Sequence, residues 1–409
     1  MGAPDVEAVW RIESARIVAA LTRFTGDFGL AEDAAQEAVA EALVSWPRTP
    51  PADPAGWLMA TARRRAIDVI RRRVALRGKY AVLAAGEVVT QEPDPDRIDP
   101  DRIDDDVLAL MFVSCHPVLS PEARVALTLR VVAGLSSQEI ARAFLVSVPT
   151  VQARITRGKK TIAAAGVPFE LPPPAERRER LGGVLSVLYV IFTEGSTATS
   201  GDRLVRPDVA YEAIRLARTL AALLPGEPEV HGLLALCELT AARFPARTAP
   251  DGSPVLLEDQ DRRRWDVSAI HRGLAALAKA SAGGLGPYGL QAAIAATHAA
   301  APSVEATDWD RIVLLYEALG RVAPSPVVEL NRAVAVAMAS GPEPALAIVD
   351  DLVVSDRLSG SHLVPTVRGE LLARLGRRPE ARAELELAAR LCANERERSV
   401  LLRKAAELD

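Results

Sequence analysis

Apolar positions recur every three to four residues through most of the 409-residue chain, a spacing that predicts helices and no strands. Residues 5–77 contain such stretches in VEAVWRIESARIVAALTRF, AEDAAQEAVAEALVSW and PAGWLMATARRRAIDVIRRRVA. Gly26 and Gly29 interrupt the pattern after the first stretch, and the proline-rich segment Trp46–Pro54 reads as a loop before the third. We therefore predict a small helical domain at residues 5–77.

The helical pattern stops at residues 78–106. Residues 87–106 carry nine acidic side chains against only Arg97 and Arg102, and prolines break the run QEPDPDRIDPDRIDDD. A segment with so few apolar residues cannot bury enough surface to fold alone, so we predict a flexible acidic linker. Helical spacing resumes over residues 107–166, which we assign to a second small domain.

The remainder of the chain reads as a large helical domain. A proline-rich linker, VPFELPPPAE at residues 167–176, precedes it. Residues 177–409 then form a succession of alanine- and leucine-rich amphipathic helices separated by short Gly/Pro turns, which is typical of stacked helical repeats. The predicted fold class is all-α: two small helical domains joined by a flexible linker, followed by a large α-helical repeat-like domain.

The strongest local signal lies in residues 134–160, GLSSQEIARAFLVSVPTVQARITRGKK. Ser136 or Ser137 can cap one short helix, and Ser147 can cap a second helix that has Pro149 in its first turn. Two short helices joined by a tight turn form a helix-turn-helix, whose second helix enters the major groove of DNA.

The exposed side of that second helix is the candidate DNA surface, because Val151 and Ile155 are spaced to face the core. Gln152 can read a base edge, while arginine and lysine side chains hold phosphates. The expected contact residues are Ser147, Pro149, Thr150, Gln152, Ala153, Arg154, Thr156, Arg157, Lys159 and Lys160. An ordinary helical hairpin with a solvated basic face is the alternative.

A second basic stretch, RRRAIDVIRRR from Arg63, places six arginines in one helix against the single acid Asp68. This density favours binding to a polyanion, although a solvated helix face is the alternative. The loop DGSPVLLEDQDRRRW from Asp251 is also dense in charge, and it fits either a solvated loop or a surface for a ligand or partner.

Composition and motif searches favour a cytoplasmic protein that is not an enzyme. The start of the chain does not resemble a signal peptide, and the longest apolar run is about half of a membrane span. GKKT at Gly158 lacks the earlier glycine of a phosphate loop, and neither HExxH nor GxSxG occurs. We expect no cofactor and no metal. The cysteines and histidines are expected to be structural: Cys115, Cys237, Cys392, His116, His231, His271, His298 and His362.

These motifs together resemble the sigma factors of bacterial RNA polymerase. EDAAQEAVAEAL and GWLMATARRRAIDVIRR are similar to sigma region two, and the segment from Leu119 to Ile162 is similar to region four. With neither a region-one nor a region-three segment, the layout resembles the extracytoplasmic-function group. CHPVL at Cys115, YVIFTEG at Tyr189 and the helical tail resemble the subgroup with a C-terminal tetratricopeptide-like extension.

The resemblance implies roles for individual positions. Asp33, Gln36 and Glu37 correspond to residues that grip the clamp helices of the polymerase largest subunit, while region four meets the flap. Gln152, Ala153 and Thr156 correspond to readers of the minus-thirty-five element. The loop Trp46–Asp53 corresponds to the segment with which the family captures a flipped base of the minus-ten element, and the arginine-rich helix would engage the promoter backbone. The family often has asparagine where Arg64 stands. The minus-ten candidates are Trp46, Arg48, Asp53, Arg63, Arg64, Arg65, Arg71 and Arg72.

The acidic linker acquires a role from the same resemblance. Asp94, Asp96, Asp99 and Asp101 would imitate RNA in the channel through which nascent RNA leaves the polymerase. The predicted function is promoter-specific initiation together with core polymerase and promoter DNA, regulated by the helical tail through a protein or peptide partner, with no membrane involved. The competing hypothesis is a helix-turn-helix regulator that acts without core polymerase and uses its repeats as a sensor.

Overall fold

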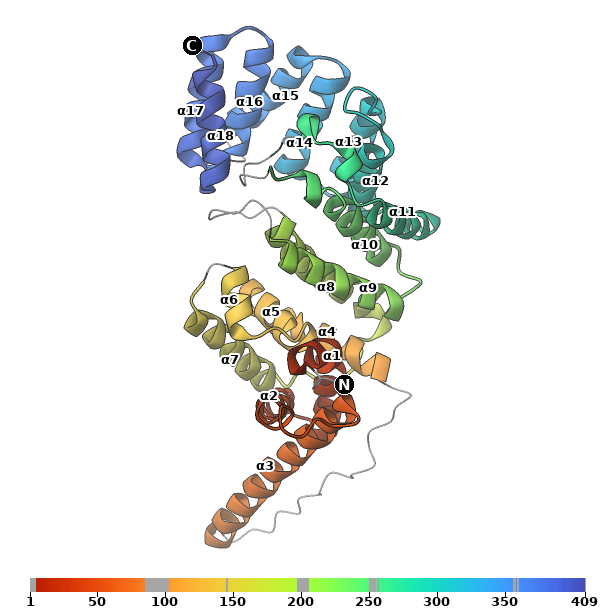
Figure 1. The fold of residues 1–409 in the computed structure, drawn as a ribbon, viewed down its shortest axis with the longest axis vertical. Helices are drawn as coiled ribbons and strands as arrows, with labels where there is room; N and C mark the ends of the chain where they lie inside the picture. Colours follow the sequence, from red (N-terminus) through yellow and green to blue (C-terminus); the bar gives the residue numbers. More distant parts are fainter. Residues whose placement is uncertain are drawn as a thin grey trace. The chain divides into compact units, whose positions relative to one another are not determined.

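The computed structural model describes residues 5–84, 103–144, 146–196, 206–249, 255, 257–355, 358 and 360–408. The regular elements within these ranges are helices (Figure 1), so the predicted all-α class is confirmed. They form two compact units, Met1–Leu188 (unit 1) and Tyr189–Asp409 (unit 2), and α8 (Pro174–Ser196) crosses that boundary. The linker residues Asp94, Asp96, Asp99 and Asp101 lie outside the described ranges.

Unit 1 begins with three mutually packed helices: α1 (Val6–Thr25), α2 (Phe28–Ser45) and α3 (Pro54–Ala84). Asp5 and Asp27 cap the first two, since their side chains accept hydrogen bonds from the backbone N–H groups of Glu7 and Leu30. Gly26 ends α1 with a φ of 65°, a conformation that favours glycine. The expected helices and the loop before α3 are confirmed.

The second half of unit 1 contains α4 (Ile103–Ser114), α5 (Pro121–Leu127), the π-helical turn η2 (Thr128–Val132), α6 (Ser137–Ala143) and α7 (Val148–Ala164). The first of these begins inside the range expected for the linker. These helices pack on the first three: α1 contacts α4 and η2, and α2 contacts α7. The two small domains expected from the sequence therefore form one compact unit.

Gly134 shows how closely these two halves approach. It adopts a φ of 74°, and a Cβ atom there would lie 2.7 Å from Oγ of Ser14 and 3.3 Å from Nε1 of Trp10, both on α1. Ser14 and Trp10 are themselves buried, at 0% and 5% exposure. A side chain at residue 134 would push the turn before α6 away from α1.

Unit 2 contains ten further helices among its described residues in addition to the end of α8. They are α9 (Pro207–Leu223), α10 (Pro228–Ala241), α11 (Val267–Ala282), α12 (Pro287–Ala300), α13 (Trp309–Val322), α14 (Pro326–Ala339), α15 (Pro342–Val354), α16 (Leu363–Arg374), α17 (Arg378–Leu391) and α18 (Glu395–Ala406). The short 3₁₀ turns η3 (Phe244–Ala246), η4 (Leu257–Asp259) and η5 (Arg262–Arg264) lie between α10 and α11.

Most of these helices pack on the helices next to them in sequence, and Figure 1 shows them following one another in the order of the colour bar. Proline opens many of them at the first turn, where its missing N–H has no helical partner anyway. The α16–α17 pair illustrates the packing, because Leu371 and Leu372 of α16 share one buried cluster with Ala381 of α17. None of the helices in the described ranges combines the length and apolarity that crossing a membrane requires.

Candidate nucleic-acid and polymerase interface

The α6–α7 pair has the local structure expected of a helix-turn-helix. Ser136 and Glu139 form a reciprocal capping box at the start of α6. At the start of α7, Oγ of Ser147 accepts a hydrogen bond of 3.2 Å from the N–H of Thr150. In the turn between the two helices, Leu145 lies outside the described part of the chain.

The burial pattern of α7 leaves one side free for a ligand. Val151 and Ile155 are 1% and 6% exposed and face the core, as predicted. The other side carries most of the candidate DNA contacts, of which Arg154, Thr150 and Lys159 are half-buried and the rest exposed: Ser147, Pro149, Gln152, Ala153, Thr156, Arg157 and Lys160. Arg154 and Arg157 also line a groove of about 410 Å³ between α5 and α7.

Lys159 has partners that the sequence did not predict. Its Nζ atom donates to Oε2 of Glu32 at 2.8 Å and to Oδ1 of Asp33 at 2.6 Å, both on α2. Nε of Arg130 donates to the other carboxylate oxygen of Glu32 at 2.9 Å. We call Glu32, Asp33, Arg130 and Lys159 the clasp. It joins the predicted polymerase-binding helix to the predicted DNA-reading helix.

The clasp is partly shielded from solvent. The side chain of Glu32 is 4% exposed, and those of Arg130 and Lys159 are 18% and 16% exposed. Burial disfavours the ammonium form of Lys159, but the adjacent carboxylates outweigh burial and raise the pKa of this lysine. Glu32 therefore pairs with two partly buried cations, and Asp33 supplies a second carboxylate to Lys159.

Further ion pairs join the same two halves of unit 1. Arg11 on α1 pairs with Glu139 on α6 at 2.5 Å, and Arg23 on α1 pairs with Asp106 on α4.

The predicted polymerase contacts on α2 differ in exposure. The side chains of Asp33 and Glu37 are 65% and 58% exposed, whereas Gln36 is half-buried. An acidic surface on α2 thus remains accessible beside the clasp.

The arginines of α3 separate into exposed and engaged side chains. Arg64, Arg71 and Arg72 are exposed and available for phosphate contacts. Arg65 pairs with Glu41 at 2.7 Å, and the guanidinium of Arg63 lies 5.3 Å from the ring centroid of Phe24.

The loop before α3 presents its charged residues and hides its tryptophan. Trp46 is 0% exposed and packs edge-to-face against Trp57 at 5.7 Å between ring centroids. Oδ1 of Asp53 accepts a hydrogen bond from the N–H of Gly56 at the start of α3, and Arg48 is exposed. In this structure the indole ring of Trp46 is packed in the core beneath the loop. It therefore presents no exposed face on which a nucleobase could stack.

The charged loop that begins at Asp251 has a packing role in its described residues, 255 and 257–265. Nη1 of Arg262 donates to the backbone carbonyls of His298 and Ala301 at the end of α12, at 2.5 and 2.6 Å. Trp265 is buried beside the guanidinium groups of Arg243 and Arg262. Burial and these two cations lower the pKa of His298 to about 4, so its imidazole is neutral at pH 7. Through the hydrogen bonds of Arg262, this part of the loop thus connects the end of α12 to the segment between α10 and α11.

Three families match parts of the chain. Sigma-70 region 2 matches residues 11–75, Sigma-70 region 4 matches residues 109–162, and a family of unknown function (DUF6596) matches residues 180–281. The two sigma matches cover α1–α3 and the segment from α4 to α7, the same helices that carry the candidate interface.

Relatives of this chain fall into two groups. An uncharacterized protein of Rhizobium meliloti (strain 1021) is 47% identical over 382 residues, which is 92% of this chain and 89% of that protein. A probable ECF RNA polymerase sigma factor of Mycobacterium tuberculosis, SigI, is 29% identical over 176 residues, 42% of this chain and 59% of its own length.

The ECF RNA polymerase sigma factor SigE of Mycolicibacterium smegmatis is 29% identical over 159 residues, 39% of this chain and 60% of its own length. No solved structure matches the chain. The coverage by the Rhizobium meliloti protein shows common family membership along nearly the whole sequence, and the sigma matches identify its N-terminal part. The chain therefore belongs to the same family as the Rhizobium meliloti protein and carries the region 2 and region 4 domains of a sigma-70-type factor for transcription initiation.

Proposed function

We propose that this chain is a sigma factor of the extracytoplasmic-function type, which binds core RNA polymerase and directs it to specific promoters. In this proposal α7 reads the minus-thirty-five element, and α3 with its preceding loop engages the minus-ten element. The observation that carries it is the face of α7, where Gln152, Thr156 and Arg157 are exposed while Val151 and Ile155 are buried.

Initiation by core polymerase is the decisive test. We expect the purified full chain, added to core polymerase and fragmented genomic DNA, to produce transcripts with defined 5′ ends that sequencing locates at a common pair of promoter elements. The double variant Arg157→Ala, Lys160→Ala should lose most of these transcripts. The matched control Arg321→Ala, Arg390→Ala, which changes two exposed arginines of unit 2, should retain them. Sequence-specific binding to duplex DNA without any core-dependent initiation would instead favour a conventional helix-turn-helix regulator.

While the clasp holds α7 against α2, unit 1 cannot contact both promoter elements at once. Elements at minus ten and minus thirty-five are about 25 base pairs apart, or about 85 Å of B-form DNA. Lys159 of α7 lies 2.6 Å from Asp33 of α2, and small domains have radii of gyration of only about 13 Å. Two such domains in contact do not span that distance. We infer that α7 must separate from α2 before the chain can engage both elements.

The connection between the halves permits such a separation. Residues 85–102 join α3 to α4, and a chain of that length reaches at most about 65 Å. The clasp also occupies Asp33, which we propose as a polymerase contact. Opening therefore releases Asp33 from its ion pair with Lys159 and lets α7 move away from α2, which couples promoter binding to polymerase binding.

We further propose that unit 2 regulates this step, as a tetratricopeptide-like surface for a protein or peptide. Truncation after Leu188 tests this, because that cut retains the buried α8 residues Leu181, Val184 and Leu185, which a cut before α8 would remove. We expect core-dependent initiation to change by about fivefold or more, measured with circular dichroism and melting as folding controls. Unchanged initiation and promoter choice by the folded truncated protein would contradict the regulatory role and leave the sigma function standing.

A further inference from the structure

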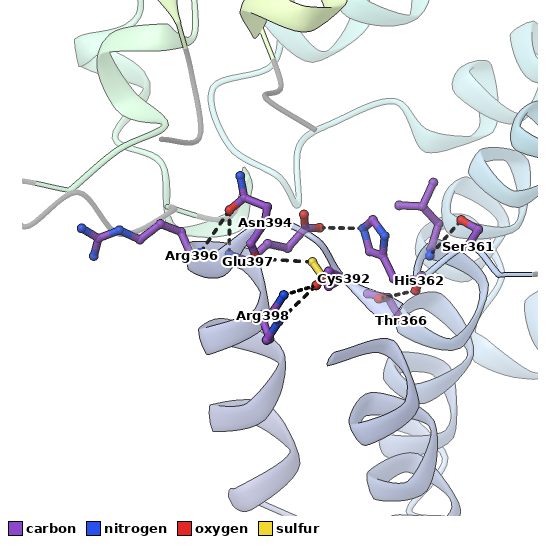
Figure 2. A network of polar contacts seen from close by, with 9 residues as sticks. Ser361, His362, Thr366, Cys392, Asn394, Arg396, Glu397 and Arg398 are labelled. Carbon is purple, nitrogen blue, oxygen red and sulfur yellow. Dashed lines mark hydrogen bonds and ion pairs between the residues drawn. The ribbon is translucent and has the colours of Figure 1, made fainter. Parts of the chain in front are cut away.

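Three side chains with metal-binding chemistry converge near the C-terminal end of unit 2 (Figure 2). His362 directly precedes α16, Cys392 directly follows α17, and Glu397 lies in the first turn of α18. Their potential ligand atoms all lie within 4.8 Å of one another. Nε2 of His362 and Oε1 of Glu397 are already 3.3 Å apart. The ends of three successive helices thus bring one thiol, one imidazole and one carboxylate close together.

The backbone around these side chains is held by hydrogen bonds. The carbonyl of Cys392 accepts two bonds from the guanidinium of Arg398, at 3.1 and 2.7 Å. Oδ1 of Asn394 accepts from the N–H of Glu397 at 3.2 Å, which caps α18, and Oγ1 of Thr366 donates to the carbonyl of His362 at 2.7 Å. Figure 2 shows these hydrogen bonds, which hold the backbone positions from which the three side chains project.

Exposure and donor type distinguish this cluster from an ordinary core contact. Cys392 is 1% exposed, while the side chains of His362 and Glu397 are 25% and 37% exposed, so an ion could approach from one side. The thiol makes a weak contact of 3.5 Å with the carbonyl of Asn394 and also interacts with the carboxylate of Glu397. A mixed sulfur, nitrogen and oxygen donor set suits zinc, whereas calcium and magnesium prefer oxygen ligands.

We propose that His362, Cys392 and Glu397 bind one zinc ion, with the fourth tetrahedral position open to water. Zinc bonds of about 2.0–2.3 Å in a tetrahedral site place the donor atoms about 3.3–3.8 Å apart. The imidazole and carboxylate already meet this requirement, and any other pair has to close by at most about 1 Å, which side-chain rotation supplies. The ion joins the ends of α16, α17 and α18, and so stabilises the last helices of unit 2.

Cobalt substitution tests this site directly in the full-length protein. We expect chelator-treated protein to bind one Co²⁺ with a thiolate-to-cobalt charge-transfer band in the near ultraviolet, and zinc to displace it. Cys392→Ser should abolish the band, while the control Cys237→Ala, which removes another buried thiol of unit 2, should retain it. Glu397→Gln should keep the band and weaken zinc affinity by at least about tenfold, because even second-shell changes have effects of that size.

Zinc should also raise the melting temperature of the wild-type chain and leave that of Cys392→Ser unchanged, since a ligand stabilises only the state that binds it. Wild-type protein that shows no charge-transfer band and retains no zinc overturns the proposal without reference to any variant. A folded Cys392→Ser protein that keeps both the band and the zinc-dependent rise in melting temperature overturns it as well.

Discussion

We expect the Glu32→Gln variant to lose about 3 kcal/mol of the free energy of unfolding of unit 1, because glutamine leaves Arg130 and Lys159 without their shared carboxylate. Glutamine has nearly the shape of glutamate, so the change removes charge and little packing. Glu32 is 4% exposed, and breaking a buried ion pair from one side leaves unpaired charges away from water. Hydrogen exchange of the full chain, followed by mass spectrometry, should show about a hundredfold faster opening of α2 and α7.

Glu13→Gln is the matched control for this prediction. Glu13 is also an acid of unit 1, but its contact with Arg16 is 3.9 Å long and the side chain of Arg16 is 53% exposed. We expect a change below about 1 kcal/mol there. Replacing Glu32, Arg130 and Lys159 together with methionine should recover much of the loss, since no buried charge then remains unpaired. Equal losses of unfolding free energy in Glu32→Gln and Glu13→Gln would show that the clasp does not stabilise unit 1.

The clasp also predicts a change in polymerase binding. Lys159→Met frees Asp33 while Arg130 still neutralises Glu32. Without DNA in the assay, we expect this variant to bind core polymerase more tightly than the wild-type chain, because less energy is needed to separate α7 from α2. Weaker or unchanged binding would argue that the packed form does not hinder the polymerase.

The second large effect concerns promoter discrimination by α7. We expect Gln152→Ala to reduce discrimination at one position of the minus-thirty-five element by about 1–3 kcal/mol, which corresponds to a factor of roughly 5 to 150. Gln152 is exposed one residue after the buried Val151, and its amide can pair with a base edge. Holoenzyme binding to promoters with single base substitutions measures this change.

Arg157→Ala should behave differently, because Arg157 is exposed and carries a charge suited to phosphate. It should weaken binding to all promoters alike and lower the slope of log affinity against log salt by about 0.9. Arg390→Ala, on α17, serves as the exposed-arginine control. If Gln152→Ala weakened every promoter equally, α7 would not be reading bases through this residue.

Much of the fold could be predicted from the sequence because the responsible interactions are local. The caps at Ser136 and Ser147 act on backbone groups three residues away, and Val151 and Ile155 share a face through the helical repeat. The boundaries of α1, α2 and the start of α3 follow from the same rules. The exposed side of α7 was thus predictable from one segment of chain.

Pairings between distant residues were not predictable in this way. Lys159 was expected to hold phosphate, and no local signal pointed to Glu32, which is 127 residues away. Trp46 was expected to face DNA, yet its indole is fully buried against Trp57. The acidic charge of residue 32 was visible, but its burial depends on where α7 packs.

The sequence by itself determined the all-α class, the helix-turn-helix and the two basic helices, because hydrophobic spacing, capping and charge act within a few residues. Only the tertiary structure decided that α7 lies on α2 and that His362, Cys392 and Glu397 meet. Such encounters depend on the packing of helices far apart in sequence, and helical periodicity specifies which face is apolar without specifying which other helix covers it.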